Sequence, residues 1–197
     1  MPFVAGVDSS TQSTKVEIRD LDSGHVVGAG SAPHAAVTPP ISEQDPGSWW
    51  LAFETAWDHA VASVPGGPGD VTAVSVAGQQ HGMVALDASD RPVHPAKLWN
   101  DTESAPDADW LLGQLADRDA DGNRITDGTE AWAAAIGSVP VAAFTATKLS
   151  WLHRTQPESW AAMARVLLPH DYLTHRMTGE YTTDLSLIHI SEPTRRH

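Results

Sequence analysis

Residues 4–15, which read V-A-G-V-D-S-S-T-Q-S-T-K, constrain the fold of this chain more than any other stretch. An apolar run leads to Asp8, a turn of small hydroxyl residues follows, and Lys15 stands seven positions after the aspartate. The pattern predicts a buried strand, a tight turn and a returning strand, with Asp8 at the end of the first strand. A carboxylate there can hold Mg2+ directly or through water, and the N–H groups of the turn can approach phosphate oxygens. On this segment alone, an ordinary β-hairpin with a polar turn remains the alternative.

Composition narrows the class of protein. The chain has 197 residues, a formal net charge of −13 and no cysteine, and its pI is about 4.9. The acidic charge argues against nucleic acid or an anionic membrane as partner, although local N–H groups and Mg2+ can still bind a nucleotide. No stretch approaches the roughly 20 apolar residues of a membrane span, and no signal peptide is visible. We therefore expect a cytoplasmic protein.

Hydrophobic periodicity predicts alternating strands and helices, which is typical of an α/β fold. A helix is expected to begin at Asp45 and Pro46, with the aspartate as N-cap, and to end at the Pro65-Gly66-Gly67 turn. Residues 71–77 are rich in β-branched side chains and predict a buried strand. The other expected strands are 3–7, 14–20, 25–30, 83–86, 97–99 and 166–168, and the other expected helices are 107–115, 130–136, 147–153, 158–163 and 171–178.

Five further segments, taken together with the Asp8 turn, resemble the amino-terminal domain of the FGGY carbohydrate kinases. They are S-E-Q-D-P-G-S-W-W (42–50), V-A-G-Q-Q-H-G-M (76–83), P-A-K-L-W-N-D (95–101), F-T-A-T-K-L-S-W-L (144–152) and L-L-P-H-D-Y-L-T-H-R-M-T-G-E (167–180). The resemblance covers residues 3–186 in order. It implies the ribonuclease H-like fold of the actin, hexokinase and sugar-kinase superfamily, a mixed sheet flanked by helices.

The resemblance also implies a domain organisation. Residues 1–186 are expected to form an incomplete amino-terminal domain, with the carboxyl-terminal domain absent. Residues 187–197 read L-I-H-I-S-E-P-T-R-R-H, which is unlike a kinase continuation and resembles translated sequencing adapter. We predict that this tail is not native; a tail from a natural frameshift is the alternative.

A sugar site is expected around G-Q-Q-H-G (78–82), a form similar to that of the xylulose-phosphorylating members of the family. A ketopentose carries only hydroxyl and carbonyl groups, so its site needs several neutral donors and acceptors, which Gln79, Gln80 and His81 supply. The flanking glycines let the backbone approach the sugar closely. The resemblance implies that Gln80 and His81 bind the substrate. In isolation, His81 also fits a surface-loop histidine.

Two other segments contribute expectations about single residues. Asn100 and Asp101 are expected near the cleft as further substrate ligands, whereas Trp99 is expected in the core. Lys148 lies in a segment similar to a family signature, although Ala143 stands where a glycine or a larger residue is more usual. We interpret Lys148 as a helix-surface lysine.

The implied reaction is the ATP-dependent phosphorylation of the C5 hydroxyl of D-xylulose to D-xylulose 5-phosphate, a step of pentose catabolism. Asp8 would act in catalysis by organising Mg2+, and the phosphates of ATP would lie near Ser9, Ser10, Thr11, Gln12 and Lys15. The implied general base is an aspartate of a Gly-Gly-Asp-Asn segment, which does not occur in this chain. The expected partners are the sugar and ATP, and a homodimer of the full-length protein is compatible with the family.

Alternative functions remain open at this point. Another FGGY substrate, such as ribulose, gluconate or a polyol, would use the same site. A non-catalytic sugar-binding or regulatory protein on the same fold is less favoured, because related repressors begin with a helix-turn-helix and this chain begins with the phosphate-loop strand.

We predict that the chain as given has no appreciable kinase activity. Two domains must close over ATP and sugar to exclude water from the phosphoryl group, and one domain cannot do so. The check is a coupled ADP-release assay with D-xylulose, in which turnover well above a protein-free blank would contradict this expectation.

Overall fold

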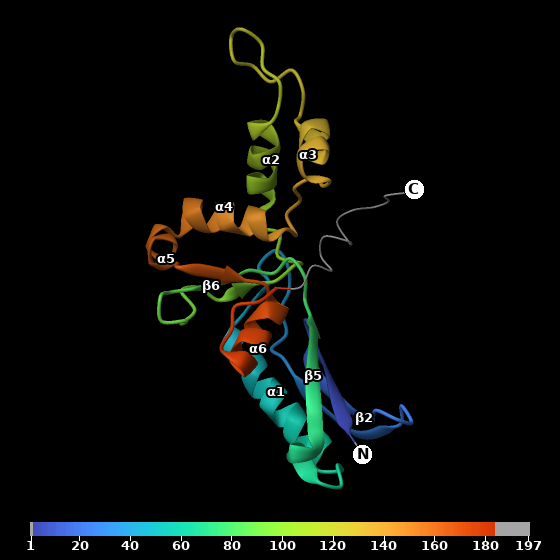
Figure 1. The fold of residues 1–197 in the computed structure, drawn as a ribbon. Helices are drawn as coiled ribbons and strands as arrows, with labels where there is room; N and C mark the ends of the chain where they lie inside the picture. The colour runs from blue at the N-terminus through green and yellow to red at the C-terminus, as the bar shows by residue number, and fades with distance from the viewer. Residues whose placement is uncertain (1, 184–197) are drawn as a thin grey trace, which may run out of the picture.

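The computed structural model describes residues 2–183, and its main element is a four-stranded mixed sheet (Figure 1). Strands β1 (Phe3–Ser9), β2 (Ser13–Asp20) and β3 (Val26–Pro33) form an antiparallel meander, and β5 (Val71–Gly78) lies parallel to β1. The strand order is β3-β2-β1-β5. The expected mixed sheet flanked by helices is confirmed, and the predicted tail at 187–197 lies outside the described residues.

Helix α1 (Pro46–Val61) packs against the meander. Its start is as predicted: Asp45 accepts a hydrogen bond from the backbone N–H of Gly47 at 2.9 Å, and Pro46 occupies the first turn. The buried face of α1 packs Phe53 with core residues of the sheet. The helix ends at Val61, earlier than predicted, and a short 3-10 helix, η1 (Gly67–Asp70), leads into β5.

A second core forms where short strands pair beside the sheet. Strand β4 (Glu43–Gln44) pairs with β7 (Ala96–Lys97), and β6 (Val84–Leu86) pairs with β8 (Arg165–Leu167). Helix α6 (Pro169–Thr178) closes this core. It is capped by Gly179, whose φ of 76° is left-handed, as a glycine permits. The buried residues of this second core are Trp49, Val84, Leu86, Ala96, Leu98, Leu167, Tyr172 and Leu173.

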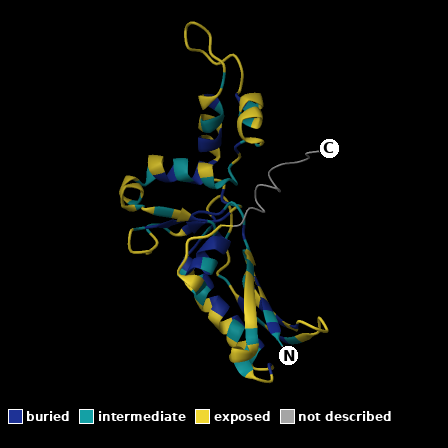
Figure 2. Cartoon of the chain, viewed as in Figure 1, coloured by how far each residue is buried: buried dark blue, intermediate teal, exposed yellow. Residues whose placement is uncertain are grey.

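The remaining helices lie beyond these strands. They are α2 (Ala105–Gln114), α3 (Thr129–Ile136), α4 (Thr145–Thr155) and α5 (Pro157–Ala162). Figure 1 shows α2, α3 and the loop between them projecting away from the sheet, and Figure 2 shows that this projection is mostly exposed. Helix α4 instead buries Trp151 and Leu152 against Met83 and Ala85. Among the described residues, no helix combines the length and the apolar character that a bilayer crossing needs.

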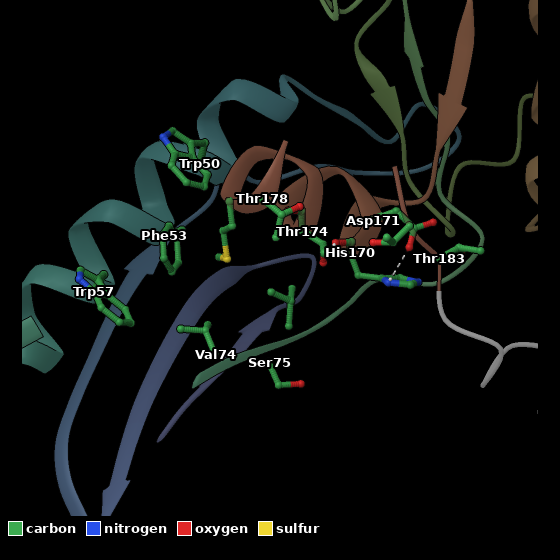
Figure 3. A pocket seen from close by; sticks show the side chains of 13 residues that line it. Trp50, Phe53, Trp57, Val74, Ser75, His170, Asp171, Thr174, Thr178 and Thr183 are labelled. Atoms are coloured by element: carbon green, nitrogen blue, oxygen red, sulfur yellow. Dashed lines mark hydrogen bonds and ion pairs between the residues drawn. The ribbon is translucent and has the colours of Figure 1, made fainter. Parts of the chain in front are cut away.

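Strand β5 departs from the sequence prediction in its burial. The strand forms as expected, but most of its residues are exposed rather than buried, as Figure 2 shows. Only β1 pairs with it among the described strands. A groove of about 710 Å³ lies between β5, α1 and α6, with aromatic side chains of α1 on one side (Figure 3). The β-branched composition predicted that both faces of this strand are covered. Residues 2–183 leave most of β5 exposed.

The short strands β6 and β7 are shorter than predicted. Residues 97–99 were expected to be a strand, but β7 ends at Lys97, because the chain turns at Leu98. Residues 83–86 contain β6, which begins at Val84. Met83 instead makes a two-way backbone pair with Lys97 at 2.8 and 3.1 Å. This pair brings the segment after β5 next to the end of β7.

The close packing of α1 on β3 predicts a clear effect of Gly28→Ala. A Cβ at Gly28 would overlap the carbonyl oxygen of Ala60, whereas a Cβ at Gly6 would meet nothing within 4 Å. We expect Gly28→Ala to lower the free energy of unfolding by about 1–3 kcal/mol, and Gly6→Ala to leave it unchanged or raise it by up to about 1 kcal/mol. Urea unfolding followed by circular dichroism measures both. Equal effects of the two substitutions would contradict the packing argument.

Candidate functional site

The candidate site lies where the carboxyl ends of β1 and β5 meet. The two strands run in parallel, with Asp8 beside Ala77 and Ser9 beside Gly78. The loops that follow parallel strands emerge at the same edge of the sheet, where ligands commonly bind. An open pocket of about 370 Å³ lies at this edge, lined by Asp8, Ser10, Thr11, Gly78, Gln79, Gln80, His81, Trp99 and Ala143.

The turn between β1 and β2 carries the predicted phosphate-binding residues. Asp8 pairs with Lys15 across the hairpin, with 4.0 Å between the carboxylate Oδ2 and the ammonium Nζ, and both side chains are exposed. Ser9 instead turns inward, and its hydroxyl lies 3.1 Å from that of Thr14. The carboxylate of Asp8 is therefore available to the pocket, and Ser9 contributes its backbone to the turn and its side chain to the core.

The other turn residues face two adjoining cavities. Ser10 and Thr11 line both the pocket described above and a neighbouring one of about 640 Å³, and Gln12 lines only the second. Gln44 holds the turn in place, because its side-chain Nε2 donates to the carbonyl oxygen of Thr11 at 3.1 Å. The indole Nε1 of Trp49 in turn donates to Oε1 of Gln44 at 2.8 Å.

The Gln79-Gln80-His81 segment forms the opposite wall. Gln79 is only 7% exposed, and its Nε2 lies 3.4 Å from the carbonyl oxygen of Ser10. Its Oε1 is buried and accepts no hydrogen bond from residues 2–183. A buried carbonyl without a donor is costly, so this oxygen is suited to a ligand hydroxyl.

His81 is held in an unusual backbone conformation at the tip of this wall. Its φ is +61°, which is uncommon for a residue other than glycine. The next residue, Gly82, packs so closely that a Cβ there would lie 2.6 Å from Cγ of Pro169. The imidazole stacks on Phe144, with 4.7 Å between the ring centroids and 23° between the planes. These contacts fix the direction in which the ring faces the pocket.

The electrostatics favour an uncharged His81. Burial lowers the pKa of His81 below its usual value, and the positive charge of Lys148 lowers it further. The imidazole is therefore neutral at pH 7, with one ring nitrogen as donor and the other as acceptor. A neutral donor and acceptor pair suits a hydroxyl ligand better than a phosphate.

The segment 99–101 differs from the sequence prediction in the place of its side chains. Trp99 was expected in the core, but it is 51% exposed and lines the pocket, with its Nε1 donating to the Thr11 hydroxyl at 3.1 Å. The preceding Leu98 takes the core position instead. Asn100 lines the neighbouring cavity, and its Oδ1 is buried and unbonded among the described residues.

Asp101 lies deeper than the other two. Its side chain is fully buried, and Oδ2 accepts hydrogen bonds from the backbone N–H of Ser42 at 2.8 Å and from Lys97 at 3.1 Å. It does not line either cavity. Its role as a substrate ligand stays a prediction, and its contacts favour support of the Trp99–Asn100 segment.

Lys97 forms the charged centre of this region, and sequence reasoning missed it. Its buried ammonium lies 2.9 Å from Glu43, 3.1 Å from Asp101 and 2.6 Å from Glu103, and 3.8 Å from the ring centroid of Trp151. Burial opposes the charge, but the three carboxylates together raise the pKa of Lys97 above its usual value. Within residues 2–183, these carboxylates are also the one group of three or more potential metal-binding side chains whose ligand atoms lie close enough together to share an ion. The ammonium already serves as their cation.

Lys148 was expected on a helix surface, and this expectation is wrong. Its side chain is fully buried, and Nζ donates to the carbonyl oxygens of Ala142 at 2.7 Å and Ala143 at 2.8 Å. Burial lowers the pKa of Lys148 to about 8, with Asp101 raising it and Lys97 lowering it. The signal that could have found it is its position in F-T-A-T-K-L-S-W-L, since Lys148, Trp151 and Leu152 share the inward face of one helix.

Comparison with known proteins places these residues in a family context. The model of the FGGY family of carbohydrate kinases, N-terminal domain, matches residues 3–193. The xylulose kinase of Streptomyces coelicolor is 47% identical over 183 residues, which covers 93% of this chain and 35% of that protein. The crystal structure of the xylulose kinase from Bifidobacterium adolescentis superposes with a TM-score of 0.79 at 41% identity, covering 93% of this chain and 35% of that one.

A more distant structure shares the fold. The gluconate kinase from Lactobacillus acidophilus superposes with a TM-score of 0.77 at 18% identity, over 93% of this chain and 34% of that one. This chain therefore spans about a third of the length of the proteins that it matches.

The Lys97 cluster predicts a large stability effect. Lys97→Met leaves three carboxylates facing one another without their cation, two of them only partly exposed and one fully buried. We expect a loss of about 3–5 kcal/mol in the free energy of unfolding, which could abolish folding. Lys15→Met removes an exposed lysine and should change the same quantity by less than about 0.5 kcal/mol. Urea unfolding at pH 7 compares them, and a small loss for Lys97→Met would contradict this assignment.

Proposed function

Because the chain belongs to the FGGY family of carbohydrate kinases, we propose that its pocket binds D-xylulose and that the whole protein phosphorylates this sugar from ATP. The observation that carries the proposal is the convergence of the Asp8 turn, the Gln79–His81 segment and Trp99 on one open pocket. These groups come from segments up to 91 positions apart, from Asp8 to Trp99. Each offers chemistry that is needed to bind a sugar or to phosphorylate it.

The sugar would contact the wall formed by Gln79, Gln80, His81 and Trp99. Gln79 offers a buried carbonyl that lacks a donor, and His81 offers a neutral imidazole. Trp99 presents an exposed ring face, which suits the C–H groups of a sugar. The wall contains no ionised side chain, so its recognition relies on several hydrogen bonds and one apolar surface. This is the pattern that a neutral ketopentose needs.

The phosphate end would lie at the turn between β1 and β2. Asp8 offers an exposed carboxylate to the pocket, and hard oxygen ligands of this kind suit Mg2+. When bound, the ion would neutralise phosphate oxygens. Ser10, Thr11 and Gln12 would contribute backbone N–H groups and hydroxyls to the phosphates of ATP, and Lys15 would add charge beside Asp8. No Gly-Gly-Asp-Asn segment occurs in the chain, so we assign the general base to none of its residues.

Within this proposal, the chain acts as the amino-terminal domain of a two-domain enzyme. The proteins that it matches are about three times as long, and a phosphoryl-transfer site needs closure around both substrates. Ribulose, gluconate or a polyol in place of D-xylulose remains the second candidate, because the relatives on this fold include a gluconate kinase.

The test is a chimera in which residues 3–183 replace the matching part of the Streptomyces coelicolor xylulose kinase. We expect ADP release that depends on D-xylulose. In this chimera, His81→Ala should lower kcat/KM by roughly 10–100-fold, as the loss of one buried hydrogen bond costs about 1–3 kcal/mol. Asp8→Asn should lower kcat on the order of 100-fold, because it weakens charge stabilisation in the transition state.

The matched control is His153→Ala, which removes an exposed histidine of α4 that contacts Trp160 and not the pocket. It should leave kcat and KM unchanged. A folded chimera that turns over ribulose or gluconate better than D-xylulose would support the second candidate. A folded chimera inactive on the whole sugar panel would overturn both.

A further inference from the structure

The first turn of α4 forms a platform beneath the loop that carries His81. Phe144, the residue at the N-terminus of the helix, stacks on the imidazole. The next residue, Thr145, donates its hydroxyl to the carbonyl oxygen of Gly82 at 3.1 Å. Two contacts therefore join the loop to the start of the helix: a ring contact at His81 and a hydrogen bond at Gly82.

Lys148 fixes this platform from inside the protein. Its ammonium binds the carbonyl oxygens of Ala142 and Ala143, the two residues that precede Phe144. The Ala142 carbonyl also accepts from Ser104 at 3.0 Å and from Thr147 at 3.2 Å. For Ala143, which lines the pocket, Lys148 is the side-chain donor. Without the ammonium, the Ala143 carbonyl loses its side-chain donor directly before Phe144.

We propose that Lys148 is a positioning residue of the site: through the Ala142 and Ala143 carbonyls it fixes the Phe144 ring against His81 and so sets the orientation of the imidazole in the pocket. The sugar contact of His81 rests on the proposed function, whereas the link from Lys148 to His81 stands on the contacts above. Lys148→Met leaves the Ala143 carbonyl without its side-chain donor, so the substitution also lowers stability. A test of positioning therefore needs a control that lowers stability elsewhere on the same helix.

The positive charge of Lys148 also favours the neutral form of the His81 imidazole. Burial lowers the pKa of His81, and the nearby ammonium lowers it further, which keeps the imidazole neutral. The titratable groups near Lys148 are the neutral His81 and the charged Asp101 and Lys97, and Lys97 is bound in turn by Glu43 and Glu103. Burial lowers the pKa of Lys148 itself to about 8. The ammonium is therefore mainly charged at pH 7 and mainly neutral at pH 9.

The experiment compares Lys148→Met with Arg154→Met in the 197-residue chain by NMR of the histidine rings, assigned with His81→Gln. For Lys148→Met we expect the His81 ring protons to lose the ring-current shift from Phe144 and the pKa of His81 to rise. Arg154 lies on the same helix and pairs with the buried Asp107 at 2.7 Å. Arg154→Met should lower stability but leave the His81 shift and pKa unchanged, which separates positioning from stability.

A measurement on the unsubstituted chain covers the case in which Lys148→Met does not fold. The His81 and Phe144 ring signals should then show an inflection near pH 8, above the titration of His81 itself, as Lys148 loses its proton. Phe144→Leu should remove the ring-current shift at His81 while keeping an apolar contact. A folded Lys148→Met with unchanged His81 signals would overturn the proposal, and so would His81 ring signals without a second inflection above the titration of His81 where that variant is unfolded.

Adding D-xylulose to the same samples separates the two proposals. If the unsubstituted chain binds the sugar, Lys148→Met should bind it at least several-fold more weakly. If the chain shows no sugar binding, sugar recognition by this chain alone fails, and the His81 shift and pKa still decide the role of Lys148.

Discussion

The arrangement of the site depends on the ammonium of Lys97. Its partners come from three parts of the chain: Glu43 in β4, Asp101 and Glu103 after β7, and the ring of Trp151 in α4. The backbone of Lys97 pairs with Met83, so the loop after β5 is tied to the same point. A buried charge must keep its hydrogen-bonding partners, because removing one of them costs about 3–5 kcal/mol. This cluster therefore sets where the pocket walls stand relative to one another.

Local chemistry predicted the elements that position the site. The hairpin that places Asp8 opposite Lys15 follows from an apolar run and a polar turn, and the Asp45–Pro46 start of α1 follows from capping chemistry. His81 could be expected at a strand end because a glycine follows the β-branched run. In each case the signal lies within a few residues of the feature that it predicts.

Burial was the property that the sequence predicted poorly, because burial depends on partners far along the chain. Trp99 and Lys148 exchanged their expected places: the tryptophan is exposed at the pocket, and the lysine is inside. Residue type favours the opposite in both cases. Lys97 carries only a weak local signal: Asp101 and Glu103 follow it closely in sequence, but Glu43 becomes its neighbour only when β4 pairs with β7. The exposed β5 shows the same limit, because a β-branched run does not reveal how many neighbours a strand has.

The parallel pairing of β1 with β5 has a consequence for the order of folding. Strands β1, β2 and β3 join neighbours in sequence, and such local contacts form early. The pairing of Phe3 with Val71 through Ser9 with Gly78 closes a loop of more than sixty residues, which is entropically costly and slow. Asp8 and His81 face one pocket only after this step. A small molecule that contacts both loops can bind only when β1 and β5 are paired. Its binding would therefore stabilise the paired state relative to states in which β5 is not yet in place.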